Sequence, residues 1–206
     1  MKAEVPEYAV HDEVCVDLAT TAVLVINMQN DFVKEGGNLL VPDAEATIPP
    51  IKRLLDLARG NRMRIVYCQD THHQGDAEWR TWPEHCREGS WGWEIISELA
   101  PAAGDAVVPK LRHDAFYGTS LDELLRGWGI TTLVLCGTVA NICVQYTASS
   151  AVLRSYAVVI PRDALSALEA FDLEASLRQT TFVFAGRLTT VAGIRVVETA
   201  TVESPA

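Results

Sequence analysis

Positive charge is scarce in this 206-residue chain, which carries 17 Lys and Arg residues against 27 Asp and Glu residues, for a formal net charge of −10. A surface with this excess of negative charge repels phosphate groups, so it argues against a nucleic acid or an anionic membrane as the partner. The charge alone does not identify a substrate.

Long apolar runs are also absent. No stretch approaches the roughly 20 apolar residues that a helix needs to span a bilayer. Residues 1–18 include acidic side chains and have no apolar core segment, unlike a secretory signal peptide. We therefore expect a cytoplasmic protein with no membrane partner.

Regularly spaced cysteines are missing as well. The chain has an odd number of cysteines at irregular spacing, which fits a reducing compartment and separate thiols better than a disulfide framework. They are Cys15, Cys68, Cys86, Cys136 and Cys143. Internal repeats and low-complexity linkers are absent too, so we expect a single α/β domain over residues 1–206.

Apolar runs alternate with amphipathic runs along the chain, which is typical of βαβ units around a parallel sheet. The expected strands are 21–27, 63–69, 105–110, 131–136, 156–161 and 186–191. The expected helices are 44–59, 91–99, 119–128, 142–154 and 169–183. The longest irregular stretch, 72–92, is rich in Trp and His, and a loop of that length in a compact domain is usually functional.

A thiol stands where the apolar run 132–136 turns into a helix that we expect to begin near Cys143. The free N–H groups and the positive dipole end of a helix favour a thiolate there and can also receive an oxyanion. The alternative is that Cys143 is one more buried thiol, because free cysteine often packs as a small apolar residue.

Two further motifs accompany the run 137–144 around Cys143. Asn27 opens the sequence Asn-Met-Gln-Asn-Asp-Phe after an apolar strand, and Lys110 ends the expected third strand before the segment 114–119. Together the three motifs resemble the isochorismatase-like cysteine hydrolases, which include nicotinamidases and carbamoyl-amide hydrolases. The resemblance runs from about residue 20 to residue 193. It implies a Rossmann-like three-layer α/β/α fold with a six-stranded parallel sheet in the order 3-2-1-4-5-6.

In the family that the chain resembles, the thiolate attacks an amide or carbamoyl carbonyl and water then cleaves the thioester. Carried over to matching positions, Cys143 is the nucleophile and Lys110 supplies positive charge and a hydrogen bond. The backbone N–H groups of Val139 and Cys143 form the oxyanion hole, and a cis peptide joins Thr138 to Val139. In a sheet of this order, ligands bind beyond the carboxyl ends of the strands where the order reverses.

Asn27 departs from the family pattern, which has a catalytic Asp in this place. An amide cannot accept the thiol proton, and losing a positioned general acid–base costs about 10²–10⁴ in rate. Three interpretations stay open: an engineered inactive variant, a natural enzyme that works without this base, and a binding protein that has lost hydrolysis. Asp31 is a weak substitute, because the family also keeps this Asp beside the usual one.

Asp70 and His72 lie two residues apart on an extended segment, so their side chains face the same way. With His85, in a Trp-Pro-Glu-His-Cys segment, they resemble the nicotinamidase site for a divalent ion. Glu78 is a possible fourth ligand and His73 a weaker one, while Cys86 is assigned to packing. Zn, Fe or Mn would suit these ligands, and the alternative is hydrogen bonding within the loop.

Five aromatic residues are candidate walls of a pocket for a planar group, against the alternative that each packs in the core. They are Phe32, Trp79, Trp82, Phe116 and Tyr117. The segment 74–79 lacks the His and Phe pattern common in nicotinamidases, which favours a small amide other than nicotinamide. The expected substrate class is therefore a small amide of either nicotinamide-like or carbamoyl type.

The leading hypothesis is therefore a cysteine amidohydrolase, and the resemblance also implies a homo-oligomer, either a dimer or a tetramer. The alternatives are a catalytically retired binding protein and an isochorismate-type vinyl-ether hydrolase. Enzymes of the latter type generally lack the cysteine that this chain has at position 143.

Overall fold

The computed structural model describes residues 4–198, and its centre is a seven-stranded sheet in which every neighbouring pair is parallel. The strands along its main path are β4 (Ala106–Lys110), β3 (Arg64–Asp70), β2 (Thr21–Ile26), β5 (Thr132–Thr138), β6 (Ala157–Pro161) and β8 (Arg187–Thr189). Counted among the six expected strands, this order is 3-2-1-4-5-6, as predicted. The seventh strand, β7 (Leu165–Ser166), was not expected and pairs with the end of β5.

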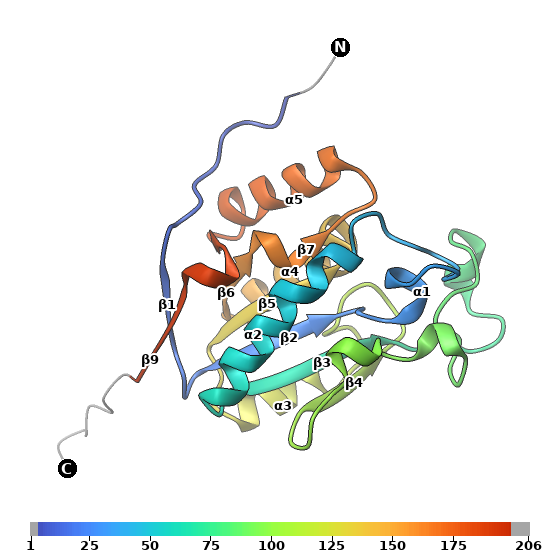
Figure 1. Ribbon diagram of the computed structural model, residues 1–206, viewed down its shortest axis with the longest axis horizontal. Helices are drawn as coiled ribbons and strands as arrows, with labels where there is room; N and C mark the ends of the chain where they lie inside the picture. The colour runs from blue at the N-terminus through green and yellow to red at the C-terminus, as the bar shows by residue number, and fades with distance from the viewer. Residues whose placement is uncertain (1–3, 199–206) are drawn as a thin grey trace.

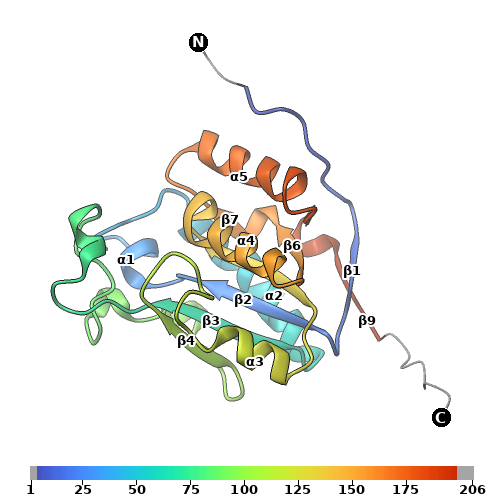
Figure 2. The same cartoon turned by 180° about the vertical axis from the view of Figure 1, so that it is seen from behind.

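Helices cover both faces of the sheet. Figure 1 shows α2 (Ile48–Gly60) crossing one face, and Figure 2 shows α3 (Leu121–Gly127) and α4 (Gln145–Leu153) over the other. The last helix, α5 (Ala170–Phe182), packs near α4 and β8. Helix α2 has prolines in its first turn, where their missing N–H groups cost nothing, and it buries Ile51, Leu54 and Leu55. The predicted three-layer α/β/α architecture is confirmed.

A separate two-stranded ladder, which the sequence did not predict, joins the two ends of the described chain. Strand β1 (Val14–Asp17) pairs in parallel with β9 (Ile194–Val197), with Val14 opposite Ile194. Both lie side by side along one edge of the molecule in Figure 1. Within residues 4–198, no helix is long and apolar enough to cross a bilayer.

The helix expected at 91–99 is wrong. The segment forms two short 3₁₀ turns, Trp91–Trp93 and Ser97–Leu99, with an extended piece between them. Its backbone bonds to a distant segment, because Asn30 donates to the carbonyl of Glu94 and Ile96 donates to that of Met28. The one-turn helix α1 (Asn30–Val33), which was not expected, stands at this junction.

The central strands are buried on both faces, as expected for parallel strands covered by helices. Every residue of β2 is buried, as are all but the first residues of β3 and β5. Because parallel strands end at the same edge, the residues at their carboxyl ends meet there. This edge receives Asn27 after β2, Asp70 at the end of β3 and Lys110 at the end of β4, and Cys143 follows β5.

A candidate active site at the carboxyl ends of the strands

Asn27, Lys110 and Cys143 are brought together by a buried carboxylate. The Asn27 amide Nδ2 donates to Cys143 Sγ at 3.1 Å and to Asp70 Oδ2 at 2.9 Å. The ammonium of Lys110 forms an ion pair with Asp70 Oδ1 and donates to the carbonyl of Arg112 at 3.0 Å. Each of these four residues is no more than 4% exposed. Asp70, predicted only as a metal ligand, therefore also links residue 27 to Lys110.

The backbone of Asn27 has φ 54°, in the left-handed region that Asn tolerates better than most residues. Its N–H donates to the carbonyl of Cys68 at 3.0 Å, and its own carbonyl accepts from Gln29 at 2.8 Å. An ionised Asp70 only accepts hydrogen bonds, so the amide presents its NH₂ group to that carboxylate. Its Oδ1 is buried without a hydrogen-bond partner.

The turn before Cys143 depends on Gly137. This residue has φ 115°, and a Cβ atom placed on it would lie 2.0 Å from the carbonyl oxygen of Ile26. Only glycine allows β5 to approach β2 this closely. The predicted cis peptide between Thr138 and Val139 is present. The chain then forms a π-helical turn, Ala140–Val144, so the regular helix α4 begins two residues after Cys143 rather than at it.

Burial raises the pKa of the Cys143 thiol to about 12, although the charge of Lys110 and the hydrogen bond from Asn27 oppose the rise. The helix terminus and the cation predict a lowered pKa for this thiol. That prediction is wrong in direction, because the effect of burying the sulfur is larger. For Lys110, burial opposes the charged form, but the charge of Asp70 outweighs it and the pKa is raised. The resting site thus holds a neutral thiol beside an ion pair.

His113 contacts the thiol and was missed in the sequence. Its Nδ1 lies 3.9 Å from Cys143 Sγ and 3.4 Å from Glu78 Oε1, and the ring packs near Tyr146. Burial, followed by the charge of Lys110, lowers the pKa of this imidazole, which favours its neutral form. Its place three residues after Lys110 was the available signal, but only the path of the loop brings the ring to the sulfur.

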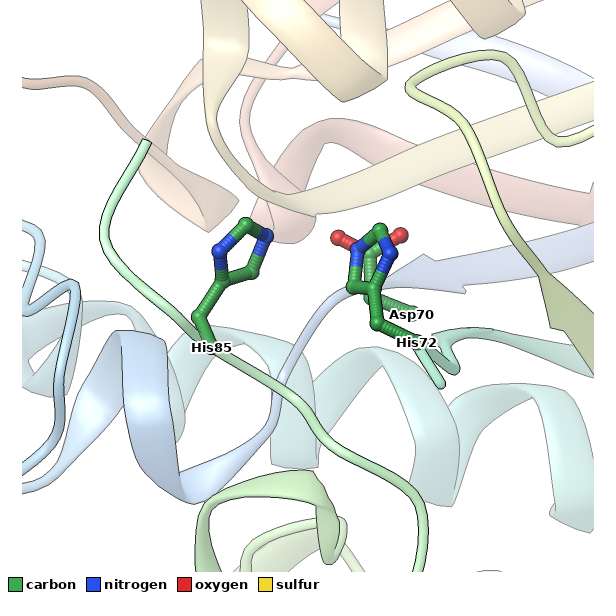
Figure 3. Close-up of side chains that lie close together, drawn as sticks. All are labelled: Asp70, His72 and His85. Atoms are coloured by element: carbon green, nitrogen blue, oxygen red, sulfur yellow. The ribbon is translucent and has the colours of Figure 1, made fainter. Parts of the chain in front are cut away.

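Asp70, His72 and His85 each offer one ligand atom, and these atoms lie within 4.8 Å of one another (Figure 3). His72 Nδ1 is 3.1 Å from Asp76 Oδ2, and His85 Nδ1 is 2.7 Å from the carbonyl of Pro83. Both partners accept, so each Nδ1 carries the proton and each Nε2 keeps its lone pair. His72 Nε2 is buried without a partner. This donor set suits a divalent ion.

Glu78 and His73 lie outside this group. Glu78 Oε1 is 4.0 Å from His72 Nε2 and 3.9 Å from His85 Nε2, which leaves it near the cluster but closer to His113. Burial raises the pKa of its carboxyl group. His73 is exposed and pairs with Glu88 at 3.3 Å. Cys86 is fully buried, and its Sγ lies against the carbonyl of Gly92.

Asp31 anchors the loop that carries the imidazoles. Its Oδ2 accepts from the backbone N–H of Cys86 at 2.7 Å, and its Oδ1 accepts from that of Asn38 at 2.9 Å. Gly92 packs against the same carboxylate, since a Cβ atom on it would lie 2.1 Å from Asp31 Oδ2. Both carboxylate oxygens are engaged in holding backbone, which fits the loop-fixing role expected for this residue.

A hollow that is partly open to solvent lies over the thiol. Its lining residues are Phe32, Leu39, Asp70, Glu78, Trp82, His85, His113, Val139, Ile142, Cys143 and Leu168. Phe32 and Trp82 were predicted walls, whereas Leu39, Ile142 and Leu168 were not, because isolated apolar residues carry no sequence signal for a pocket.

Three predicted pocket walls lie elsewhere. Phe116 stacks on Tyr156 in the core, with ring centroids 5.9 Å apart. Tyr117 is 67% exposed on the surface. Trp79 packs beside His72, and its Nε1 donates to the carbonyl of His85 at 3.2 Å. Core packing therefore accounts for Phe116, and Trp79 supports a candidate metal ligand instead of lining the hollow.

Residues 21–192 match the family model of the Isochorismatase domain. Ureidoacrylate amidohydrolase RutB of Serratia proteamaculans (strain 568) is 33% identical over 170 residues, which cover 70% of this chain and 68% of that protein.

Two solved structures are also similar. N-carbamoylsarcosine amidase of Thermoplasma acidophilum is 35% identical with a TM-score of 0.78, and the match covers 84% of this chain and 96% of that one. Pyrazinamidase of Pyrococcus horikoshii, solved in complex with zinc, is 26% identical with a TM-score of 0.75, and the match covers 87% and 99% respectively.

Proposed function

Because this chain belongs to the isochorismatase family, we propose that it is a cysteine amidohydrolase that cleaves a small amide of nicotinamide-like or carbamoyl type through a Cys143 thioester. The observation that carries this proposal is the junction of Cys143 Sγ, Asn27 and the Lys110–Asp70 pair, of which Cys143 and Asp70 line the hollow. Similarity to a ureidoacrylate amidohydrolase and an N-carbamoylsarcosine amidase supports amide cleavage.

In the proposed reaction, Cys143 Sγ forms a bond to the carbonyl carbon as its proton leaves the thiol. The carbonyl oxygen becomes an oxyanion, which the backbone N–H groups of Val139 and Cys143 would hold. The C–N bond then breaks, the amine departs with a proton, and water hydrolyses the thioester to the acid and free thiol. Lys110 contributes a fixed positive charge beside the developing negative charge.

Asn27 holds the sulfur but cannot take its proton. The amide donates to Sγ, and this hydrogen bond favours the thiolate over the thiol. Proton transfer must therefore use another group, and His113 is the second side chain in polar contact with Sγ. We expect this form of the site to work slowly, since an aligned carboxylate base is worth about 10²–10⁴ in rate.

We propose Asp70, His72 and His85 as ligands of a divalent ion, with Zn, Fe or Mn as candidates and Glu78 as a possible fourth ligand. The buried and unpartnered Nε2 of His72 supports this assignment. A bound ion would supply a Lewis acid that orients a substrate lone pair. The similar pyrazinamidase was solved with zinc. A homo-oligomer, a single domain and a cytoplasmic location stay predictions.

A catalytically retired binding protein is the second candidate, and Asn27 is the observation that favours it. The complete junction around the thiol favours an enzyme instead. An isochorismate-type vinyl-ether hydrolase is disfavoured by Cys143, since that chemistry needs an acid rather than a thiol.

The decisive test is to incubate the protein with nicotinamide, pyrazinamide and carbamoyl compounds, then measure ammonia release and the mass of denatured Cys143 peptides. We expect an acyl adduct on Cys143 for at least one compound and none in Cys143→Ala. Absence of adduct and of ammonia with every compound would favour the binding protein.

Asn27→Asp provides the second arm of this test. The change should raise ammonia release at least about 100-fold, the lower end for a general acid–base. The new carboxylate would stand beside Asp70, where the amide now donates at 2.9 Å, so some stability should be lost. No gain in a folded variant would refute a carboxylate at residue 27 as the missing base.

A further inference from the structure

Asp76 is a buried carboxylate that the proposed reaction does not use. Its side chain is 6% exposed and lies four residues after His72. Its Oδ2 is 3.1 Å from His72 Nδ1, while its Oδ1 accepts from the backbone N–H of Glu78 at 2.9 Å. Arg112 Nη1 donates to both oxygens, at 3.0 and 3.2 Å. One carboxylate therefore contacts three separate parts of the site.

The contact with His72 decides which imidazole nitrogen is free. An ionised carboxylate accepts only, so the proton of a neutral His72 is held on Nδ1 and the lone pair on Nε2. That lone pair is the form a metal ion requires. The same Nε2 is buried, lacks a hydrogen-bond partner and faces the other two members of the cluster.

Arg112 ties this carboxylate to the thiol side of the site. Its carbonyl accepts from the Lys110 ammonium at 3.0 Å, while its guanidinium holds Asp76. Arg112 thus connects the thiol side of the site with the proposed metal ligands, because its backbone contacts Lys110 and its side chain contacts Asp76. Because Arg112 is held at both its backbone and its side chain, Asp76 has little freedom to turn away from His72.

We propose that Asp76, clamped by Arg112, is a positioning residue that sets the tautomer and orientation of His72 for a divalent metal ion. This rests on the proposed metal site, but it assigns a role to residues outside the ligand set. Outer carboxylates of this kind typically change metal affinity about 10–100-fold when removed.

Asp76 also caps the 3₁₀ turn Ala77–Arg80 through its contact with Glu78, so a purely structural role is the competing explanation. Three variants separate the two roles. Asp76→Asn keeps one acceptor oxygen and turns the other into an NH₂ donor, so it can serve the cap or His72 but not both. Asp76→Ser keeps a capping hydroxyl but is too short to reach His72, and Asp76→Ala removes both contacts.

The test is Zn²⁺ affinity of the full chain, measured by competition with a chromophoric chelator, with ¹⁵N NMR of the imidazoles in metal-free protein as a second readout. We expect Asp76→Ser and Asp76→Ala to weaken Zn²⁺ binding about 10–100-fold, and Asp76→Asn, which loses one of the two acceptors, to fall between them and the parent. His72 should carry its proton on Nδ1 in the parent and populate both tautomers in the Ser and Ala variants. The exposed neighbour substitution His73→Ala should change neither readout.

The outcomes separate this inference from the metal site itself. If His72→Ala leaves Zn²⁺ affinity unchanged, the proposed metal site fails. If His72→Ala abolishes binding while Asp76→Ser binds like the parent and keeps one tautomer, capping is the only role of Asp76 and the inference is overturned.

Discussion

Asn27, Lys110 and Cys143 stand at or just beyond the ends of strands, whereas His72, Glu78 and His85 lie on or beside an irregular loop after β3. The first group is fixed by the sheet: Ile26 pairs with Gly137, and Asp70 pairs with Lys110. The second is held by one isolated β-bridge, between His72 and Arg87, and by side chain–backbone bonds such as those of Asp31 and Asp76. The two halves face one hollow but depend on different kinds of support.

This difference predicts which half of the site keeps its geometry when the protein is perturbed. A strand end moves only if several ladder bonds move with it, so the thiol half should keep its geometry until the protein unfolds. The loop half should open more readily, because a single isolated bridge holds it rather than a strand ladder. Asp70 belongs to both halves, and substitutions around it should reveal how far they are independent.

The largest effect is expected from Lys110→Met, which leaves Asp70 as an unpaired buried charge. Breaking a buried ion pair in this way costs about 3–5 kcal/mol, and urea unfolding measures the loss. Lys34→Met is the matched control, because its two glutamate partners are exposed and such pairs contribute about 0–1 kcal/mol. Equal losses in the two variants would show that the Lys110–Asp70 pair does not support the fold.

A smaller and more local effect is expected from Asp31→Ala, which removes the acceptor for the backbone N–H of Cys86. An unsatisfied buried donor costs about 1–3 kcal/mol. Hydrogen exchange should speed up around His85, while alkylation of Cys143 stays within twofold.

The control for that experiment is Asp163→Ala, which removes a similar bond to the N–H of Val191 away from the site. It should destabilise the protein without loosening the loop. If Asp31→Ala alters Cys143 as much as it alters the loop, the halves are not independent.

The pH dependence of stability tests both halves at once. Burial raises the pKa of Cys68 and of Cys143 to about 12, and it raises that of Cys86 as well. A raised folded pKa means that stability is complete below the unfolded value of about 8.5 and is lost as pH rises toward the folded value. Each such thiol should remove about 1.4 kcal/mol per pH unit above pH 9.

Chemical denaturation between pH 7 and 10 measures this slope, and Cys68→Ala should reduce the slope by the contribution of one thiol. An unchanged slope would mean that Cys68 ionises in the folded protein at its ordinary pKa.

The smallest effect is expected in the alkylation of Cys143 by iodoacetamide. The buried thiol should react more slowly than the exposed Cys15 below pH 9, which reverses the expectation from sequence. His113→Phe should slow the alkylation of Cys143 about a further tenfold, because a nearby proton acceptor is lost. A tenfold change in the thiolate fraction corresponds to one pKa unit. Peptide mass spectrometry follows both thiols with chelator present, and His73→Phe serves as control. A rate unaffected by His113→Phe would remove this imidazole from the thiol's proton path.

The features that could be predicted from the sequence are those that a continuous stretch of residues encodes. The apolar runs of β2 and β5 gave buried parallel strands, and the spacing of Asp70 and His72 placed two side chains on one side of an extended segment. The motif around Cys143 gave the position of the thiol but not its pKa, because nothing in the motif reports burial of the sulfur.

What the sequence did not predict depends on contacts between distant segments. The extended segment around Ile95 takes its hydrogen bonds from residues near Gln29, so a local helical pattern there was misleading. Strands β1 and β9 are short and form only by pairing across almost the whole chain. His113 and Arg112 carry no pattern of their own, and only the folded loop shows what they touch.

The left-handed backbone at Asn27 restricts the evolutionary choices at that position. Glycine, asparagine and aspartate adopt this conformation readily, whereas other residues pay about 1–2 kcal/mol for it. The backbone of the turn therefore accepts a carboxylate or an amide alike, although a carboxylate would meet Asp70, and a lineage can cross between them by one substitution. Loss of the base at this position leaves the surrounding architecture in place, so the same short step that silences such a site can also restore it.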